Sequence, residues 1–200
     1  MITKITLKTH DSPKVTWSTW LAIADPQAAF LPDLVGYVAS EAKYLMDSGL
    51  SGYNYIAHAM PNPTPGRGLP DVLAGVMGGL MLQDSTSERV YEIFQPLNET
   101  IYQRWKGKAD LYVMTEEFPS FLAWYGENYD KSKAGGSSWI ASRLLDETAL
   151  GSKNIGEALW GAAKPDGGIS IFFVGGKGAQ SSRDNAVNTA WRRAYVHACG

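Results

Sequence analysis

Apolar side chains recur at intervals of three and four residues in several segments, and this spacing predicts amphipathic helices. The clearest stripe runs from Phe30 to Leu45, after a helix start at Asp25-Pro26 and before a C-terminal cap at Gly49. A second stripe, from Val90 to Trp105, follows Ser85-Thr86-Ser87-Glu88, which has the spacing of a capping box. Two shorter helices are expected over residues 119–129 and 155–163.

Other segments alternate apolar and polar residues or are rich in β-branched and aromatic residues, as strands are. Strands are predicted over residues 2–8, 15–23, 52–60, 72–82, 111–116, 139–145, 168–175 and 187–199. Several strands follow one another with no helix between them, which favours antiparallel pairing with helices on one face of the sheet. We therefore expect an α+β fold with a mostly antiparallel sheet. No Pro- or Ser-rich linker divides residues 1–200, so one domain is expected.

The composition changes this picture in two ways. Seven Trp, ten Tyr and six Phe are many for 200 residues, and such side chains line pockets for flat, apolar ligands. The net charge of -2 and the lack of a Lys or Arg run argue against nucleic acid as a partner. No apolar run is long enough for a membrane span, and the alternating N-terminus does not resemble a signal peptide. A cytoplasmic protein is expected.

Several kinds of chemistry lack support in the sequence. Cys199 is the only cysteine, and it lies close to the last residue, which is a poor place for a preorganised nucleophile. The three histidines, His10, His58 and His197, are far apart, so no metal site is expected. No Gly-x-Ser-x-Gly elbow is present. Gly175-Gly176-Lys177-Gly178 lies between two predicted strands, which favours a hairpin connection over a phosphate-binding loop.

The C-terminal third carries a recognisable order of segments. Ser142-Arg143-Leu144-Leu145 precedes the segment Ile169–Gly176, and Asn185–His197 follows. This order resembles the end of the substrate domain in berberine-bridge-enzyme-like FAD-linked oxidases of the fungal type. There an "SRL" strand, a "GG" strand and an "N-x-AWR-x-A-x-x-H" strand succeed one another. Ile2–Val15 also resembles the strand that enters that domain, so the resemblance spans nearly the whole chain.

The departures from that family bear on the cofactor. The family holds its flavin in a separate N-terminal domain, with a glycine-rich pyrophosphate loop and usually a His bonded to the flavin. This sequence shows neither pattern, and Thr189 stands where the family often has Pro. We therefore expect a substrate-domain-like chain without the FAD-binding domain and without a cofactor. The sheet surface that such a domain would cover predicts a homodimer.

Strand alternation places Trp191, Arg193, Tyr195 and His197 on one face of the last predicted strand. The resemblance implies that the sheet face opposite the helices lines the substrate pocket. Arg193 could hold a carbonyl or enolate oxygen, and Tyr195 or His197 could donate a proton to it, so these three are the catalytic candidates. Trp191 is a substrate-binding candidate. The alternative is an exposed edge with solvated polar side chains.

Tyr53 and Tyr55 share one face of their predicted strand, and Asn54 and His58 share the other. The sequence does not decide which face meets the pocket. We favour the two tyrosines as substrate-binding residues, because an aromatic pair can stack on a planar molecule. The alternative is ordinary core packing.

Three more residues are candidates for substrate binding. Trp17 and Trp20 fall on opposite faces of their strand, so one of them should reach the open face, and Trp20 is our candidate. Trp139 shares a predicted face with Arg143, and both are candidates. Arg143 could equally pair with a carboxylate such as Glu116, and each tryptophan could equally belong to the core.

Two classes of function follow from this reading. The first is a cofactor-independent enzyme of fungal secondary metabolism that steers a cyclisation, a Diels–Alder-type cycloaddition or an isomerisation of a polyketide- or terpenoid-like substrate. Such reactions need shape, orientation and a few hydrogen bonds, and no redox group. The second is a non-catalytic binding protein, or a subunit that completes a flavin site on another chain. A truncated, degenerate gene product is a third hypothesis.

Overall fold

The computed structural model describes residues 4–7, 9, 11–62, 70–131, 140–163, 168–176 and 187–200. The strands are β1 (Val15–Ala24), β2 (Ser51–Pro61), β3 (Val72–Gln83), β4 (Ala109–Phe118), β5 (Ser142–Asp146), β6 (Ile169–Phe173) and β7 (Ala194–Cys199). They form one sheet in the order β4-β1-β3-β2-β6-β7-β5, in which neighbours pair antiparallel. The predicted α+β fold with an antiparallel sheet is confirmed.

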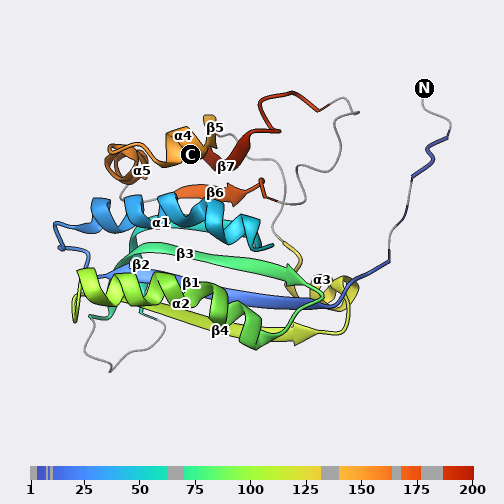
Figure 1. The fold of residues 1–200 in the computed structure, drawn as a ribbon, viewed down its shortest axis with the longest axis horizontal. Coiled ribbons are helices and arrows are strands. Elements are labelled where there is room, and N and C mark those ends of the chain that lie inside the picture. The colour runs from blue at the N-terminus through green and yellow to red at the C-terminus, as the bar shows by residue number, and fades with distance from the viewer. Residues whose placement is uncertain are drawn as a thin grey trace.

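The helices in the described residues are α1 (Leu31–Asp47), α2 (Ser87–Arg104), α3 (Phe121–Asn128), α4 (Glu147–Leu150) and α5 (Ile155–Ala162). Four of them, α1, α2, α4 and α5, cover one face of this sheet (Figure 1). In Figure 1, α1 and α2 run side by side in front of the strands, and α4 and α5 lie beside α1. We call the sheet face beneath these four helices the helix face and the opposite one the open face. The short helix α3 packs on the open face, through Trp124 against Trp17 of β1.

The main hydrophobic core lies between the helix face and the helices. Trp20, Ala22 and Ala24 of β1 point into it, because every second residue of a strand faces the same side. The predicted stripe on α1 supplies Leu34 and Leu45, both fully buried. The hydrophobic period of α1 and the alternation along β1 therefore meet in one core, as the sequence predicted.

Several boundaries differ from the prediction. Residues 4–7 belong to no strand, although an edge strand was expected over 2–8. The helix expected from Asp25 begins at Leu31, because the Asp25 carboxylate accepts the Gln27 amide and forms a turn first. The N-cap of α2 is Thr86, whose hydroxyl accepts the Arg89 amide, and not Ser85. The short helix α4 was not anticipated.

The largest difference concerns the last strand. It was predicted over 187–199, yet β7 begins only at Ala194. Residues 189–193 form turns instead, with the Asn188 side chain accepting the Ala190 amide. In β7 itself, Val196 pairs with Leu145 while Ala194 pairs with Asp146, so Tyr195 falls at a β-bulge.

Candidate functional site

Seven open-face positions from all seven strands align in one row across the sheet. The register places Met114 beside Thr19, Thr19 beside Gly79, and Gly79 beside Tyr53. The row continues through Phe172, His197 and Leu144. We call these seven residues, Met114, Thr19, Gly79, Tyr53, Phe172, His197 and Leu144, the open-face row.

Aromatic rings gather in the part of the open-face row that lies on β2, β6 and β7. Tyr53 meets Phe172 edge-to-face, with ring centroids 5.3 Å apart. His197 lies 5.9 Å from Phe172 and 5.0 Å from Trp191, which approaches it from the turn before β7. The side chain of Tyr53 is 55% exposed, so its ring is available to a ligand. The structure thus brings Tyr53, His197 and Trp191 together.

A glycine shapes the middle of the open-face row. The indole of Trp17 lies directly over Gly79, where a Cβ atom would overlap it. The same indole packs against Trp124 of α3, with centroids 5.0 Å apart. Gly79 therefore lets a large flat side chain lie close to the strands instead of standing up from them. Trp17, and not Trp20, is the tryptophan of β1 that reaches the open face.

A second row of open-face residues lies two positions further along each strand. It contains Tyr112, Leu21, Met77, Tyr55, Ser170, Cys199 and Ser142. Tyr55 is 45% exposed in this row, on the same face as Tyr53. Tyr53 and Tyr55 lie on the open face, because Asn54 between them is buried on the helix face. Their role in substrate binding stays a prediction.

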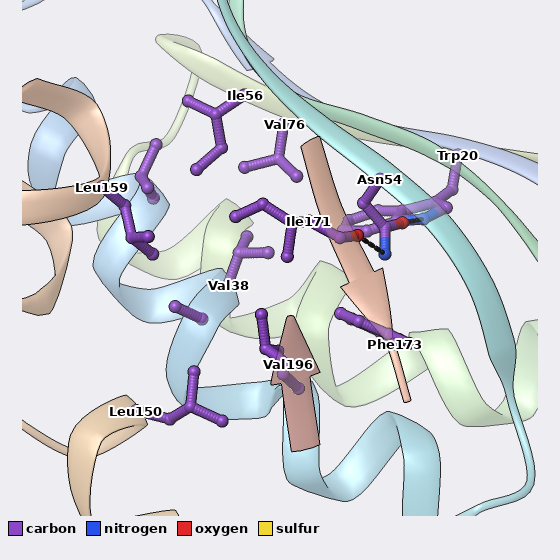
Figure 2. Close-up of a pocket in the computed structure, with 13 residues that line it drawn as sticks. Trp20, Val38, Asn54, Ile56, Val76, Leu150, Leu159, Ile171, Phe173 and Val196 are labelled. Carbon is purple, nitrogen blue, oxygen red and sulfur yellow. Dashed lines mark hydrogen bonds between the residues drawn. The ribbon is translucent and has the colours of Figure 1, made fainter. Parts of the chain in front are cut away.

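Trp20 lies on the wrong side of the sheet for this surface. It is fully buried, and its Nε1 donates to Asn54 Oδ1 at 2.8 Å while Asn54 Nδ2 donates to the Ile171 carbonyl (Figure 2). Both residues line an enclosed apolar cavity between α1 and the sheet. That cavity leaves about 20 Å³ for the centre of a water molecule, which is room for about one water and not for a substrate. The expected exposure of Trp20 to a ligand is therefore wrong.

Arg193 and Tyr195 also lie apart from the open-face row. Because of the bulge, Tyr195 turns toward α1, where its hydroxyl lies 3.5 Å from Asp47 Oδ1 and Lys43 Nζ lies 5.5 Å from its ring centroid. Lys43 donates to Asp47 at 2.7 Å, and this bond raises the pKa of Lys43. Arg193 precedes the strand and lines the same open pocket of about 270 Å³ as Tyr195. The expected single face for Arg193, Tyr195 and His197 is thus wrong.

Arg143, another substrate-binding candidate, also lies away from the open-face row. Arg143 is exposed on β5 and pairs with Ala198, whose neighbour Ile171 is buried on the helix face. Its expected partner Glu116 is on β4, at the opposite edge of the sheet, so that pairing is wrong. Trp139 lies outside the described residues.

Sequence reasoning missed Phe172, Trp17 and Cys199 as members of the open face. Phe172 alternates with Ile171 and Phe173, so its face could have been read from strand period alone. Cys199 lies two residues after His197, so strand alternation alone also places it on the face of His197. Among the described residues, no group of three His, Cys, Asp or Glu side chains could hold a metal ion.

The comparisons with known proteins give a fold and no family. No protein-family model matches the chain, and no curated protein matches it. The crystal structure of the VAO-type flavoprotein MtVAO713 from Myceliophthora thermophila C1 matches with a TM-score of 0.73 and 21% identity, over 94% of this chain and 34% of that chain. The VAO-type flavoprotein MtVAO615 at pH 5.0, from the same organism, matches with a TM-score of 0.63 and 12% identity, over 95% and 33%.

The chain therefore has the fold of one part of VAO-type flavoproteins and spans about a third of the length of these solved chains. This confirms the expected flavin-oxidase-like fold at that coarser level. No helix in the described ranges has the length and apolar character to cross a membrane.

Gly175 and Gly176 do not form a cradle for a flavin pyrophosphate. The amide of Gly175 donates to the Tyr195 carbonyl, so it is not free for a phosphate. A Cβ on Gly175 would come within 2.6 Å of the Ala194 carbonyl oxygen, and one on Gly176 within 2.5 Å of the Met46 oxygen. Close packing against β7 and α1 explains these two glycines. Lys177 and Gly178 lie outside the described residues.

Proposed function

We propose that the open face binds a flat, apolar or aromatic small molecule and that the chain acts on it as a cofactor-independent enzyme. The proposed reaction is a cyclisation, a Diels–Alder-type cycloaddition or an isomerisation of a polyketide- or terpenoid-like substrate in fungal secondary metabolism. One observation carries the proposal: the open-face row combines exposed aromatic rings with an imidazole.

The dimensions of the row support a ligand of two or three fused rings. Tyr53, Phe172 and His197 lie on three adjacent strands, which span about 10 Å at the usual strand spacing. A planar ligand lying over them would contact Tyr53 and Phe172 with its face or edge. His197 would then lie at one end of the ligand, where it could give or take a proton at a carbonyl or an adjacent carbon.

Replacing Tyr53 with alanine should weaken the binding of a planar polyketide. We expect the Kd for emodin to rise about tenfold, since an aromatic contact contributes roughly 0.5–1.5 kcal/mol beyond its buried area. Quenching of tryptophan fluorescence would measure the affinity. Tyr102→Ala is the matched control, because Tyr102 is 57% exposed on α2, outside the open face. Equal affinities for both variants would exclude the open face as the binding surface.

A second candidate function is a subunit that completes a flavin site on another chain. The VAO-type fold favours it, because this chain spans only about a third of the flavoproteins that share the fold. The same open face would then meet a partner that carries the flavin.

The chain purified by itself should release no flavin on denaturation. The physical reason is that the described glycines at 175 and 176 pack against the protein and do not face a phosphate. Absorbance near roughly 450 nm, where oxidised flavins absorb, measures this directly. One flavin per chain would contradict the expectation and would count against a cofactor-independent enzyme.

A further inference from the structure

His197 and Cys199 lie two residues apart on β7 and therefore share the open face. The Sγ atom of Cys199 lies 3.3 Å from Nε2 of His197 and 3.7 Å from Nδ1. The sequence argued against Cys199 as a nucleophile because it lies close to the last residue, but pairing with Ser142 and Ser170 on its two sides fixes its position in the sheet. A thiol within reach of a neutral imidazole is the arrangement that activates a cysteine as a nucleophile. This pair joins the open-face row to the second row, which contains Tyr55.

Aromatic side chains hold the His197 imidazole in place, and the residues across from His197 and Cys199 carry no charge. Trp191 and Phe172 contact the His197 ring from two directions, with centroids 5.0 Å and 5.9 Å away. Cys199 is half-buried, so a ligand can reach its sulfur. The cross-strand neighbours of the pair are all uncharged: Ser142, Leu144, Ser170 and Phe172. None of these neighbours is a charged group that could compete for the thiol proton.

We propose that His197 and Cys199 form a base and nucleophile pair that adds reversibly to a flat, aryl-conjugated enone on the open face. The inference rests on the proposed function and deepens it, because it names a substrate class and selects isomerisation among the proposed reactions. The aryl ring lies over Tyr53 and Phe172, and the conjugated double bond lies toward Cys199. A conjugated carbonyl compound is the substrate class in which a soft thiolate attacks carbon without any redox partner.

The reaction balances without an oxidant or reductant. His197 takes the thiol proton, and the sulfur forms a C–S bond with the β-carbon of the enone. The π pair of the C=C bond forms a double bond between Cα and the carbonyl carbon, and the C=O π pair moves onto oxygen, which gives an enolate. The Cα–Cβ bond is now single and rotates. The carbonyl then re-forms, its displaced pair restores the Cα–Cβ double bond in the other geometry, the C–S bond breaks, and the departing thiolate takes its proton back from His197.

The first test measures thiol reactivity. Cys199 is the only cysteine in the chain, so iodoacetamide labelling followed by mass spectrometry reports this residue alone. We expect His197→Gln to slow alkylation at pH 7 at least about tenfold, because a positioned base contributes roughly 10²–10⁴ to proton transfer. His58→Gln is the matched control, since His58 contacts the Trp160 carbonyl on the helix side. Equal alkylation rates in wild type and His197→Gln would overturn the pair.

The second test measures turnover with cis-chalcone, an aryl enone whose conversion into trans-chalcone is followed by absorbance. Wild type should accelerate the conversion, and Cys199→Ser should return it to the uncatalysed rate while retaining the melting temperature. Conversion at the wild-type rate by Cys199→Ser would overturn the nucleophilic role. If Cys199→Ser still binds emodin and wild type leaves cis-chalcone unchanged, the inference fails while the proposed binding function stands. If emodin does not bind but His197 still accelerates alkylation, the binding function fails and the reactive pair stands.

Discussion

Trp20→Ala should destabilise the fold by about 3–5 kcal/mol, the usual loss for removing a large aromatic side chain from a core. Trp20 is fully buried and packs against Phe94 of α2, with centroids 5.4 Å apart. The substitution would also remove the donor to Asn54 Oδ1, and an unpaired buried acceptor adds to the loss. A loss of this size is a large fraction of the stability of a typical domain. Urea unfolding followed by circular dichroism would measure it.

Two further variants separate the contributions of Trp20. Trp20→Phe keeps an aromatic ring in the core but removes the indole N–H and part of the indole volume, so it should cost about 1–3 kcal/mol. Tyr102→Ala is the exposed control, and we expect a change within about 0.5 kcal/mol, as at most surface positions. If Trp20→Ala unfolded like wild type but no longer bound emodin, Trp20 would be a ligand contact after all.

Gly156→Ala should destabilise the chain by about 1–3 kcal/mol, although alanine is the better helix former. Gly156 of α5 lies against the backbone of α1: a Cβ there would overlap the Pro32 carbonyl oxygen and lie 2.9 Å from the Gly36 amide nitrogen. Both neighbours are backbone atoms, so no side-chain rotation can relieve the contact. The helix α5 would have to move away from α1 and from the cavity that Leu159 lines.

Gly161 provides the matched control within the same helix. A Cβ at Gly161 meets nothing within 4 Å, so Gly161→Ala should stabilise α5 by roughly 0.5–1 kcal/mol. The two substitutions are chemically identical and should shift the urea midpoint in opposite directions. A stabilising Gly156→Ala would mean that α5 is not packed closely on α1.

The architecture was predictable because the two hydrophobic periods are strong in this sequence. The stripe of α1 and the alternation of β1 are long enough to define both elements and their buried sides. Glycines are unusual inside a strand, and β3 carries several. The structure explains them, because Gly78 makes room for the Asn54 side chain and Gly79 for Trp17.

The site was predictable only in part, because strand alternation holds only where the strand is regular. Tyr53 and Tyr55 were correctly paired on one face, and the burial of Asn54 between them decides which face is open. Tyr195 was misplaced because a bulge depends on pairing with β5, far away in the sequence. Asn188 is a signal that was present but not used, since Asn often begins a turn by accepting a nearby amide.

The sheet consists of two blocks of adjacent strands, and each block comes from one continuous part of the sequence. The four strands β4, β1, β3 and β2 come from residues 15–118, and β6, β7 and β5 come from residues 142–199. The four N-terminal strands can therefore pair with one another during synthesis. The edge of β2 stays unpaired until β6 has been made. Tyr53 and Phe172 lie on the two sides of that boundary. The aromatic surface is consequently assembled only when the C-terminal strands dock, so a variant that delays docking should yield chains in which the open-face row is incomplete.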